Sequence, residues 1–158
     1  MAKKPYEDRT DPEKIQSQWH KLSGLHTREE WSAAIVRAAT AAEIAANHAI
    51  RCEFDQQSQL SAHFVDSALR WANGLAGKMD RLLLPMTMSS KKKHAKVKEL
   101  RKIALVINER RNAIAHQGEF CNEGEAKEII AAAQRFITGL VTLYDAAFVL
   151  KKRKNAAA

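Results

Sequence analysis

The chain has 158 residues, the size of one domain, and 46% of them are hydrophobic. Its 26 Lys and Arg residues exceed its 18 Asp and Glu residues, and the formal net charge of +8 favours a polyanionic partner such as nucleic acid, with a basic surface that binds nothing as the alternative. No apolar run approaches the roughly 20 residues of a membrane-spanning helix, and the first residues lack the apolar core of a secretory signal. We therefore predict a cytoplasmic protein with no membrane association and with reduced cysteines.

The composition predicts helices, because Ala, Leu, Ile, Lys, Glu and Arg dominate and alternating runs of β-branched and aromatic residues are absent. Asp-Pro-Glu at 11–13 predicts a helix start with Asp as the N-cap, and the short helix should end near Leu22, before Gly24. Thr-Arg-Glu-Glu at 27–30 has the pattern of a capping box and predicts the start of a long helix that ends near Glu53.

A third helix is expected over about 57–76, with glycines at its end. The segment 78–90 is mixed, because Pro85 should break a helix, and Ser89-Ser90 is a plausible N-cap. A basic helix is expected to follow from Lys91. Its apolar positions keep helical spacing at Val97, Leu100, Ala104 and Ile107.

The last helix should follow a loop over 118–124 and span about 125–150. Its apolar residues recur at steps of three and four, namely Ile129, Ala133, Phe136, Leu140, Leu143 or Tyr144, and Ala147. Together the elements predict an all-α fold, an antiparallel four-helix bundle with an extra short N-terminal helix. The expected organisation is an N-terminal extension over 1–26, the bundle over 27–150 and a basic C-terminal tail over 151–158.

The residues with the clearest chemical potential lie at the end of the basic helix, where Arg111, Asn112 and His116 fall within six positions. Asn112 and His116 are four apart and share a helix face, whereas Arg111 lies about 140° around the helix from His116. The three could face one cleft if the helix loosens near Ala115 or if a second chain completes the cleft. The alternative is a helix C-terminus whose cations favour the dipole, which does not account for Asn112.

This trio suits the cleavage of RNA, because the ribose 2′-OH is a nucleophile that the substrate already carries. His116 can transfer the proton, Arg111 can hold the phosphoryl oxygens, and Asn112 can orient either of them. One histidine cannot easily be acid and base at the same instant. A second His116 from a symmetry-related subunit would supply the missing group, so the chemistry suggests a homodimer with a composite site.

The segment Arg111-Asn112-Ala113-Ile114-Ala115-His116 resembles the Arg-polar-x-x-x-His signature of HEPN domains, and the Ala-rich segment 37–47 is similar to the early helix of that family. HEPN domains are α-helical and occur in many metal-independent endoribonucleases of toxin–antitoxin, antiviral and RNA-processing systems. The resemblance implies that Arg111 and His116 are the catalytic pair and Asn112 the polar helper. It implies RNA as substrate, no metal or cofactor, and an antitoxin or regulatory protein as partner. An inactive HEPN-like scaffold that binds RNA or a nucleotide is the alternative, and a purely structural role is another.

Two further residues are candidates for support of this site. Glu43 interrupts an apolar stripe and needs a cation or donors, which Arg111 or His116 could supply; a structural ion pair is the alternative. Arg110 lies next to the motif and is included as a supporting residue. The candidates for binding the RNA backbone are the basic residues of the preceding helix, with a solvated face as the alternative; they are Lys91, Lys92, Lys93, Lys96, Lys98, Arg101 and Lys102.

The remaining candidates favour structural roles. His48 and Cys52 lie one helical turn apart, but two ligands are too few for zinc, so we predict no metal site. Six aromatic residues are expected in the core or a dimer interface, with base stacking as the minority alternative; they are Trp19, Trp31, Trp71, Phe54, Phe64 and Phe148.

Overall fold

The structure is a computed structural model that describes residues 4–152, and within that range the chain is helical and contains no strand. Of the predicted tail, only Lys151 and Lys152 belong to the described residues; 153–158 lie outside them, as do 1–3 of the predicted N-terminal extension. The elements are α1 (Asp11–Thr27), α2 (Trp31–Gln57), α3 (Ala62–Trp71), α4 (Gly74–Lys78), the π-helical η1 (Met79–Leu83), α5 (Leu84–Met86), α6 (Lys91–Gln117) and α7 (Glu123–Val141). The prediction of an all-α helical bundle is confirmed.

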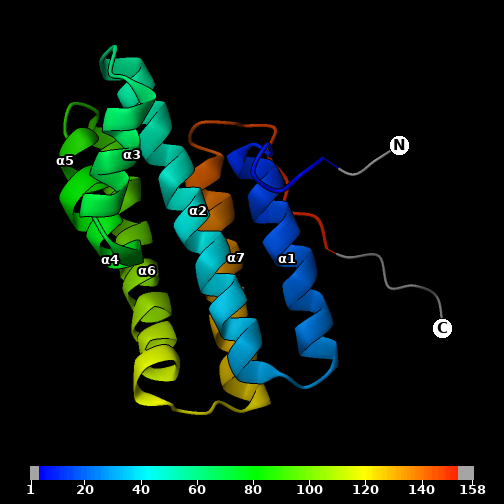
Figure 1. Ribbon diagram of the computed structural model, residues 1–158. Coiled ribbons are helices and arrows are strands. Elements are labelled where there is room, and N and C mark those ends of the chain that lie inside the picture. Colours follow the sequence, from blue (N-terminus) through cyan, green and yellow to red (C-terminus); the bar gives the residue numbers. More distant parts are fainter. Residues whose placement is uncertain (1–3, 153–158) are drawn as a thin grey trace.

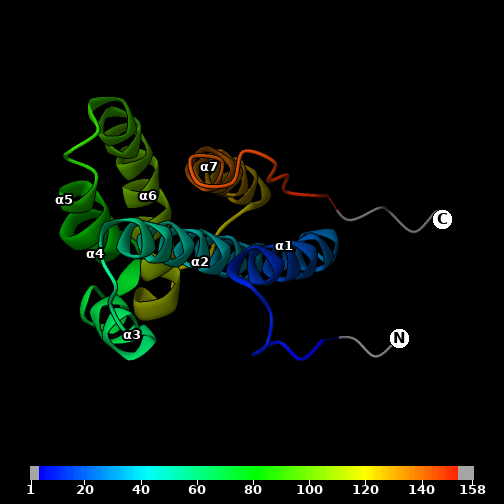
Figure 2. The ribbon, with the colours of Figure 1, turned by 90° about the horizontal axis from the view of Figure 1, so that it is seen from above.

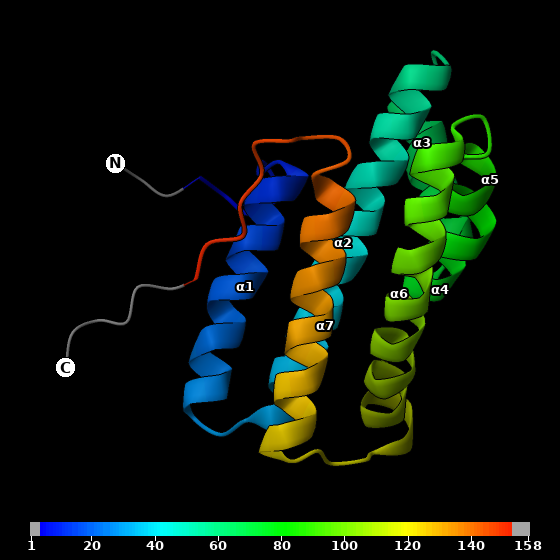
Figure 3. The same cartoon turned by 180° about the vertical axis from the view of Figure 1, so that it is seen from behind.

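Helix α2 lies at the centre of the bundle and contacts the other long helices α1, α6 and α7 (Figures 1 and 3). Helix α1 runs antiparallel to α2, and α6 runs antiparallel to both α2 and α7 (Figure 1). The shorter elements α3, α4, η1 and α5 lie on the side of α2 away from α1 (Figure 2). This arrangement leaves part of α2 facing α6 and α4, where the candidate site lies.

The core depends on a face of small residues along α2. Ala38, Ala42 and Ala45 are fully buried there, and further alanines extend the face along the helix. Because alanine presents only a methyl group, the neighbouring helices approach α2 closely and fill the space with their own larger side chains. Those side chains include Ile15, Trp19 and Leu22 of α1, Val97, Leu100 and Ile107 of α6, and Phe136, Ile137 and Leu140 of α7. Helix α1, which the sequence assigned to an extension, thus contributes to the same core.

The start of the chain differs from the prediction in its capping residues. Thr10, not Asp11, is the N-cap of α1, and its hydroxyl and the Glu13 carboxylate form a reciprocal capping box. Helix α1 continues through Gly24 to Thr27, because Thr27 donates to the Ser23 carbonyl (2.9 Å) rather than capping the next helix. The predicted capping box at 27–30 is therefore wrong, and α2 begins at Trp31 without a side-chain cap.

The predicted helix over 57–76 is also wrong, because the chain breaks there into α3 and α4. The break centres on Gly74, whose φ of 73° is in the left-handed region that favours glycine. Pro85, expected to end any helix, instead lies in the first turn of α5, directly after the π-helical turn η1. The wider π turn accommodates a residue that has no N–H to donate. The N-cap prediction at Ser90 is confirmed, since its hydroxyl accepts from the Lys93 N–H (3.4 Å).

Helix α7 is shorter than predicted and spans Glu123–Val141 rather than 125–150. The residues after it turn back over α1, and the Lys151 backbone exchanges two hydrogen bonds of 2.8 Å with the Gln16 side chain. Ala147, expected on the buried stripe, is exposed for this reason. Within residues 4–152, none of the helices has the length and apolar character needed to cross a bilayer.

Candidate active site

Arg111, Asn112 and His116 meet on one side of α6 although the helix stays regular to Gln117. Arg111 Nη1 lies 3.3 Å from His116 Nε2 and 3.0 Å from Asn112 Oδ1. Arg111 therefore reaches His116 without the loosened helix or the second chain that the sequence suggested as routes. The long arginine side chain spans the angle that separates the two backbone positions. When His116 is neutral with its proton on Nδ1, Nε2 accepts from the guanidinium.

Helix α6 ends directly after this group at Gly118, whose φ of 67° is left-handed. The Gly118 N–H donates to the Ala113 carbonyl. Gly118 thereby caps the helix, and Gln117 is its last residue. The glycine that follows the motif in the sequence therefore fixes where the helix stops and keeps His116 in its last turn.

The three residues line a cavity of about 390 Å³ between α2 and α6, which we call the α2–α6 cavity. Its volume is within the range of small-molecule sites. The start of α4 closes it on a third side. The lining residues are Ala39, Thr40 and Glu43 from α2, residues 73–76 from the start of α4, and Asn108, Arg111, Asn112 and His116 from α6.

Glu43 lines this cavity but pairs with a residue that the sequence analysis missed. Lys78 Nζ lies 2.9 Å from Glu43 Oε1 and 3.5 Å from the Ala72 carbonyl. The Lys78 side chain is 6% exposed, whereas that of Glu43 is 36% exposed and reaches the cavity. The predicted pairing of Glu43 with Arg111 or His116 is not observed, because the buried ammonium of Lys78 holds the carboxylate. The sequence signal was the position of Lys78 at helical spacing from Leu75 and Leu82, both buried.

Asn108 is a second cavity residue that the sequence analysis missed. It lies one turn before Asn112 on the same face of α6, a spacing that could have identified it. Its side chain faces the start of α4, since a Cβ added to Gly74 would lie 3.8 Å from Asn108 Oδ1. Asn108 and Asn112 thus place two amide groups in one wall of the cavity.

Arg110 points away from this cavity and toward α7, contrary to its assignment as a supporting residue. Its guanidinium bonds Glu119 (2.6 Å), Glu125 (3.3 Å) and the Phe120 carbonyl (2.9 Å). The hydrogen bond that Arg110 donates to Glu119 is the main cause that raises the pKa of Arg110. Arg110 therefore fastens the loop after α6 to α7 and has a structural role.

The basic residues of α6 divide into paired and unpaired groups. Lys93 bonds the buried Glu53 (2.7 Å), Lys96 pairs with Glu99 (3.4 Å), and Arg101 pairs with Asp80. The remaining members of the predicted RNA-binding set are exposed and form no ion pair with any residue in the described part of the chain; they are Lys91, Lys92, Lys98 and Lys102. Of these, Lys91, Lys98 and Lys102 share one side of α6 with His116. The successive separations along the helix, from Lys91 through Lys98 and Lys102 to His116, are 7, 4 and 14 residues, and each is close to a whole number of turns.

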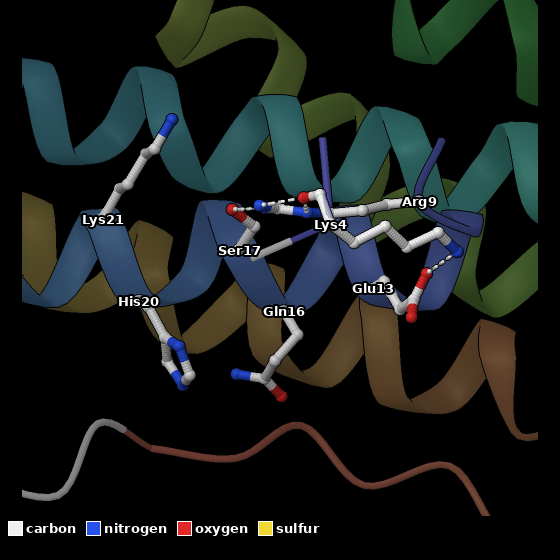
Figure 4. A pocket seen from close by; sticks show the side chains of 7 residues that line it. All are labelled: Lys4, Arg9, Glu13, Gln16, Ser17, His20 and Lys21. Carbon is white, nitrogen blue, oxygen red and sulfur yellow. Dashed lines mark hydrogen bonds and ion pairs between the residues drawn. The ribbon is translucent and has the colours of Figure 1, made fainter. Parts of the chain in front are cut away.

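A larger hollow of about 590 Å³ lies on the outer side of α1, beneath the N-terminal segment (Figure 4). Its polar groups already bind one another: Arg9 donates to Ser17 (3.0 Å) and to the Lys4 carbonyl (2.9 Å), and Lys4 pairs with Glu13 (3.2 Å). None of the residues that the sequence singled out for chemistry lines it. We therefore assign this hollow to the attachment of the N-terminal segment.

His48 and Cys52 contact each other on α2, with 3.8 Å between Nε2 and Sγ. Burial lowers the pKa of His48 and raises the pKa of the Cys52 thiol, which disfavours the thiolate that a metal ion would need. Residues 4–152 include no group of three or more potential metal ligands.

The aromatic residues, which were predicted for the core or a dimer interface, are only partly in the core. Trp19 is buried, and Trp31 packs edge-to-face on His26 with 4.9 Å between ring centroids. In contrast, Phe64 and Trp71 on α3 are 53% and 62% exposed.

Comparison of the chain with protein-family models, with curated proteins and with solved structures finds no match. A function for this chain is therefore inferred from the motif and from the cavity that surrounds it.

Proposed function

We propose that this protein is a metal-independent endoribonuclease of HEPN type, which cleaves RNA through attack of the 2′-OH on the neighbouring phosphodiester. The observation that carries the proposal is the contact of 3.3 Å between Arg111 Nη1 and His116 Nε2 inside the α2–α6 cavity. A fixed cation and an imidazole are thereby aimed at one point that a phosphate can reach. The family resemblance extends the proposal to a cytoplasmic toxin or antiviral defence effector under the control of an antitoxin or regulatory protein.

The chemistry assigns a role to each member of the motif. The guanidinium of Arg111 binds two phosphoryl oxygens and stabilises the charge that builds on them in the transition state. His116 takes the proton from the 2′-OH as the O2′–P bond forms, or gives a proton to the 5′-oxygen as the P–O5′ bond breaks. Such proton transfer typically contributes 10²–10⁴ in rate. The products are a 2′,3′-cyclic phosphate and a free 5′-OH. Asn112 holds the guanidinium in place through its Oδ1 (3.0 Å).

The second proton transfer is assigned to another copy of the chain. Each copy contributes one imidazole at this cavity, because His116 is the only histidine among the lining residues of the described chain. In a homodimer with the two cavities joined, one His116 acts as base and the other as acid. The exposed Lys91, Lys98 and Lys102 lie on the same side of α6 and would guide the RNA backbone toward the motif.

The direct test uses purified protein on mixed single-stranded RNA, with and without EDTA. We expect cleavage that EDTA does not abolish, products with 2′,3′-cyclic phosphate ends, and a loss of at least about 100-fold in His116→Ala. The matched control is His20→Ala, an exposed histidine on α1 that does not line the cavity, and it should cleave like the parent. Cleavage that disappears with the chelator, or that persists in a folded His116→Ala variant, overturns the proposal. Binding of RNA without turnover by the parent protein would instead support the inactive scaffold.

The homodimer is tested by mixing the parent protein with the inactive His116→Ala variant. In a composite site each dimer needs both copies of His116, so a mixed dimer should be inactive and the activity should fall with the square of the parent fraction. If each chain forms its site alone, the mixed dimer keeps one working site and the activity falls in proportion to the parent fraction. The mixed dimer itself is counted by native mass spectrometry, so that absence of exchange is not read as an independent site.

A further inference from the structure

An exposed indole lies at the end of α3, immediately before the wall of the α2–α6 cavity. Trp71 is 62% exposed, and α3 turns its buried residues Val65 and Leu69 toward the bundle instead. A tryptophan that is left in solvent offers a large apolar surface that a ligand or a partner can cover.

Arg81 of η1 holds this indole in place. Its guanidinium carbon lies 5.4 Å from the centroid of the Trp71 ring, and its Nη1 donates to the Trp71 carbonyl (3.2 Å). The cation covers one part of the ring, and the arrangement fixes the side chain before any ligand arrives. A pre-positioned aromatic ring with an adjacent guanidinium is the combination that single-stranded nucleic acids bind, the ring for a base and the cation for a base or phosphate.

Trp71 lies close in the chain to the residues that line the α2–α6 cavity. Trp71 is two residues before Asn73, the first lining residue at this side, so their Cα atoms are at most roughly 7 Å apart. The chain that carries the indole therefore leads directly into the wall of the cavity. Helix α3, which ends at Trp71, and helix α4, whose start lines the cavity, both lie on the side of α2 away from α1 (Figure 2).

We propose that Trp71, positioned by Arg81, stacks on a nucleobase of single-stranded RNA next to the phosphodiester in the α2–α6 cavity. The inference rests on the proposed function and adds the part of the substrate that the motif does not contact. A nucleobase fits better than an apolar protein surface, because the Arg81 guanidinium lies beside the ring and the next exposed aromatic residue, Phe64, is two helical turns away. Trp71 and Arg81 are thus binding residues for the base.

The experiment measures binding in the His116→Ala background, so that it does not depend on cleavage. A short single-stranded oligoribonucleotide is added while tryptophan emission is recorded, and its affinity is measured separately by fluorescence anisotropy. Trp19 is buried and Trp31 packs on His26, so Trp71→Phe identifies the Trp71 signal. A matched abasic oligonucleotide presents the same phosphates without bases. Phe64→Ala is the control for an exposed aromatic residue on the same helix.

We expect saturable quenching of Trp71 by the RNA and none by the abasic strand. Trp71→Ala should weaken the affinity for RNA by about 5- to 150-fold, the range that loss of one base stack produces, and should leave the affinity for the abasic strand unchanged. Trp71→Phe should keep most of the affinity, and Phe64→Ala should keep all of it. The inference is overturned if RNA binds without quenching Trp71, or if Trp71→Ala binds RNA as tightly as its parent. It is also overturned if the quenching follows protein concentration alone, as self-association would produce. These results leave the cleavage proposal standing, whereas stacking by a parent protein that does not cleave RNA would overturn only the cleavage proposal.

Discussion

The ion pair between Lys78 and Glu43 predicts that removing its two members has unequal costs. Glu43→Gln leaves the Lys78 ammonium, 6% exposed, with an amide oxygen and a weak contact to a backbone carbonyl. Breaking a buried pair in this way costs about 3–5 kcal/mol, and because Glu43 is 36% exposed we discount that to about 2–3 kcal/mol. Lys78→Met leaves instead a carboxylate with access to water and keeps the packing of the aliphatic stem, so it should cost at most about 1 kcal/mol.

The measurement is urea unfolding followed by far-UV circular dichroism, with thermal unfolding as a second readout. One kcal/mol corresponds to roughly 2–4 °C in a chain of this size, so Glu43→Gln should lower Tm by about 4–12 °C and Lys78→Met by at most about 4 °C. The double variant should be more stable than Glu43→Gln alone, because Lys78→Met then removes an unpaired buried charge. If Lys78→Met is as destabilising as Glu43→Gln, or if the double variant is the least stable of the three, the reasoning is refuted.

Two other buried features have measurable consequences. Burial opposes the charge of Glu53, but hydrogen bonds from donors that include Lys93 and Tyr144 outweigh it and hold the pKa of the carboxyl below its ordinary 4.5. The stability that Glu53 contributes is therefore complete above pH 4.5 and lost as the pH falls through the lower folded pKa. Glu53→Gln should lower the free energy of unfolding by about 3 kcal/mol near neutral pH. Urea titrations at decreasing pH should show this difference from the parent shrinking in acid. A difference that stays constant down to acid unfolding would contradict this assignment. On α7, a Cβ at Gly139 would lie 2.9 Å from a methyl group of the buried Leu100. Gly139→Ala should therefore destabilise the protein by about 1 kcal/mol in urea unfolding, although alanine has the better helix propensity. A stabilised variant would show that α6 and α7 are not in close contact there.

The sequence predicted most successfully those features that depend on local pattern. The apolar spacing of α6 identified Val97, Leu100, Ala104 and Ile107, all of which are buried, and Ser90 was found as the N-cap. The Thr-x-x-Glu pattern occurs twice, at Thr10–Glu13, where it caps α1, and at Thr27–Glu30, where it caps no helix. Only the turn at Glu29, which has a φ of 62°, decides that the second pattern does not cap a helix.

The site was predicted in its composition but not in its geometry. The backbone positions of Arg111 and His116 lie on different faces of α6, but the long arginine side chain still reaches the histidine. The position of a residue on a helix face does not show how far its side chain extends. Asn108 and Lys78 each had a local signal, but their place at or beside the cavity depends on the break at Gly74, where α4 turns back toward α6. Such long-range proximity depends on tertiary packing rather than on spacing along the chain.

The alanine face of α2 has a consequence for how this protein can change. Ala39 is 7% exposed, belongs to the core and also lines the α2–α6 cavity, so one methyl group serves both. The distance between α2 and its neighbours that the small side chains permit is then also the width available to a ligand. Substitutions of core residues usually leave activity unchanged, but substitutions along this face of α2 would change the width of the cavity before they changed the stability of the fold. Variation along α2 should consequently be constrained by ligand size as much as by stability.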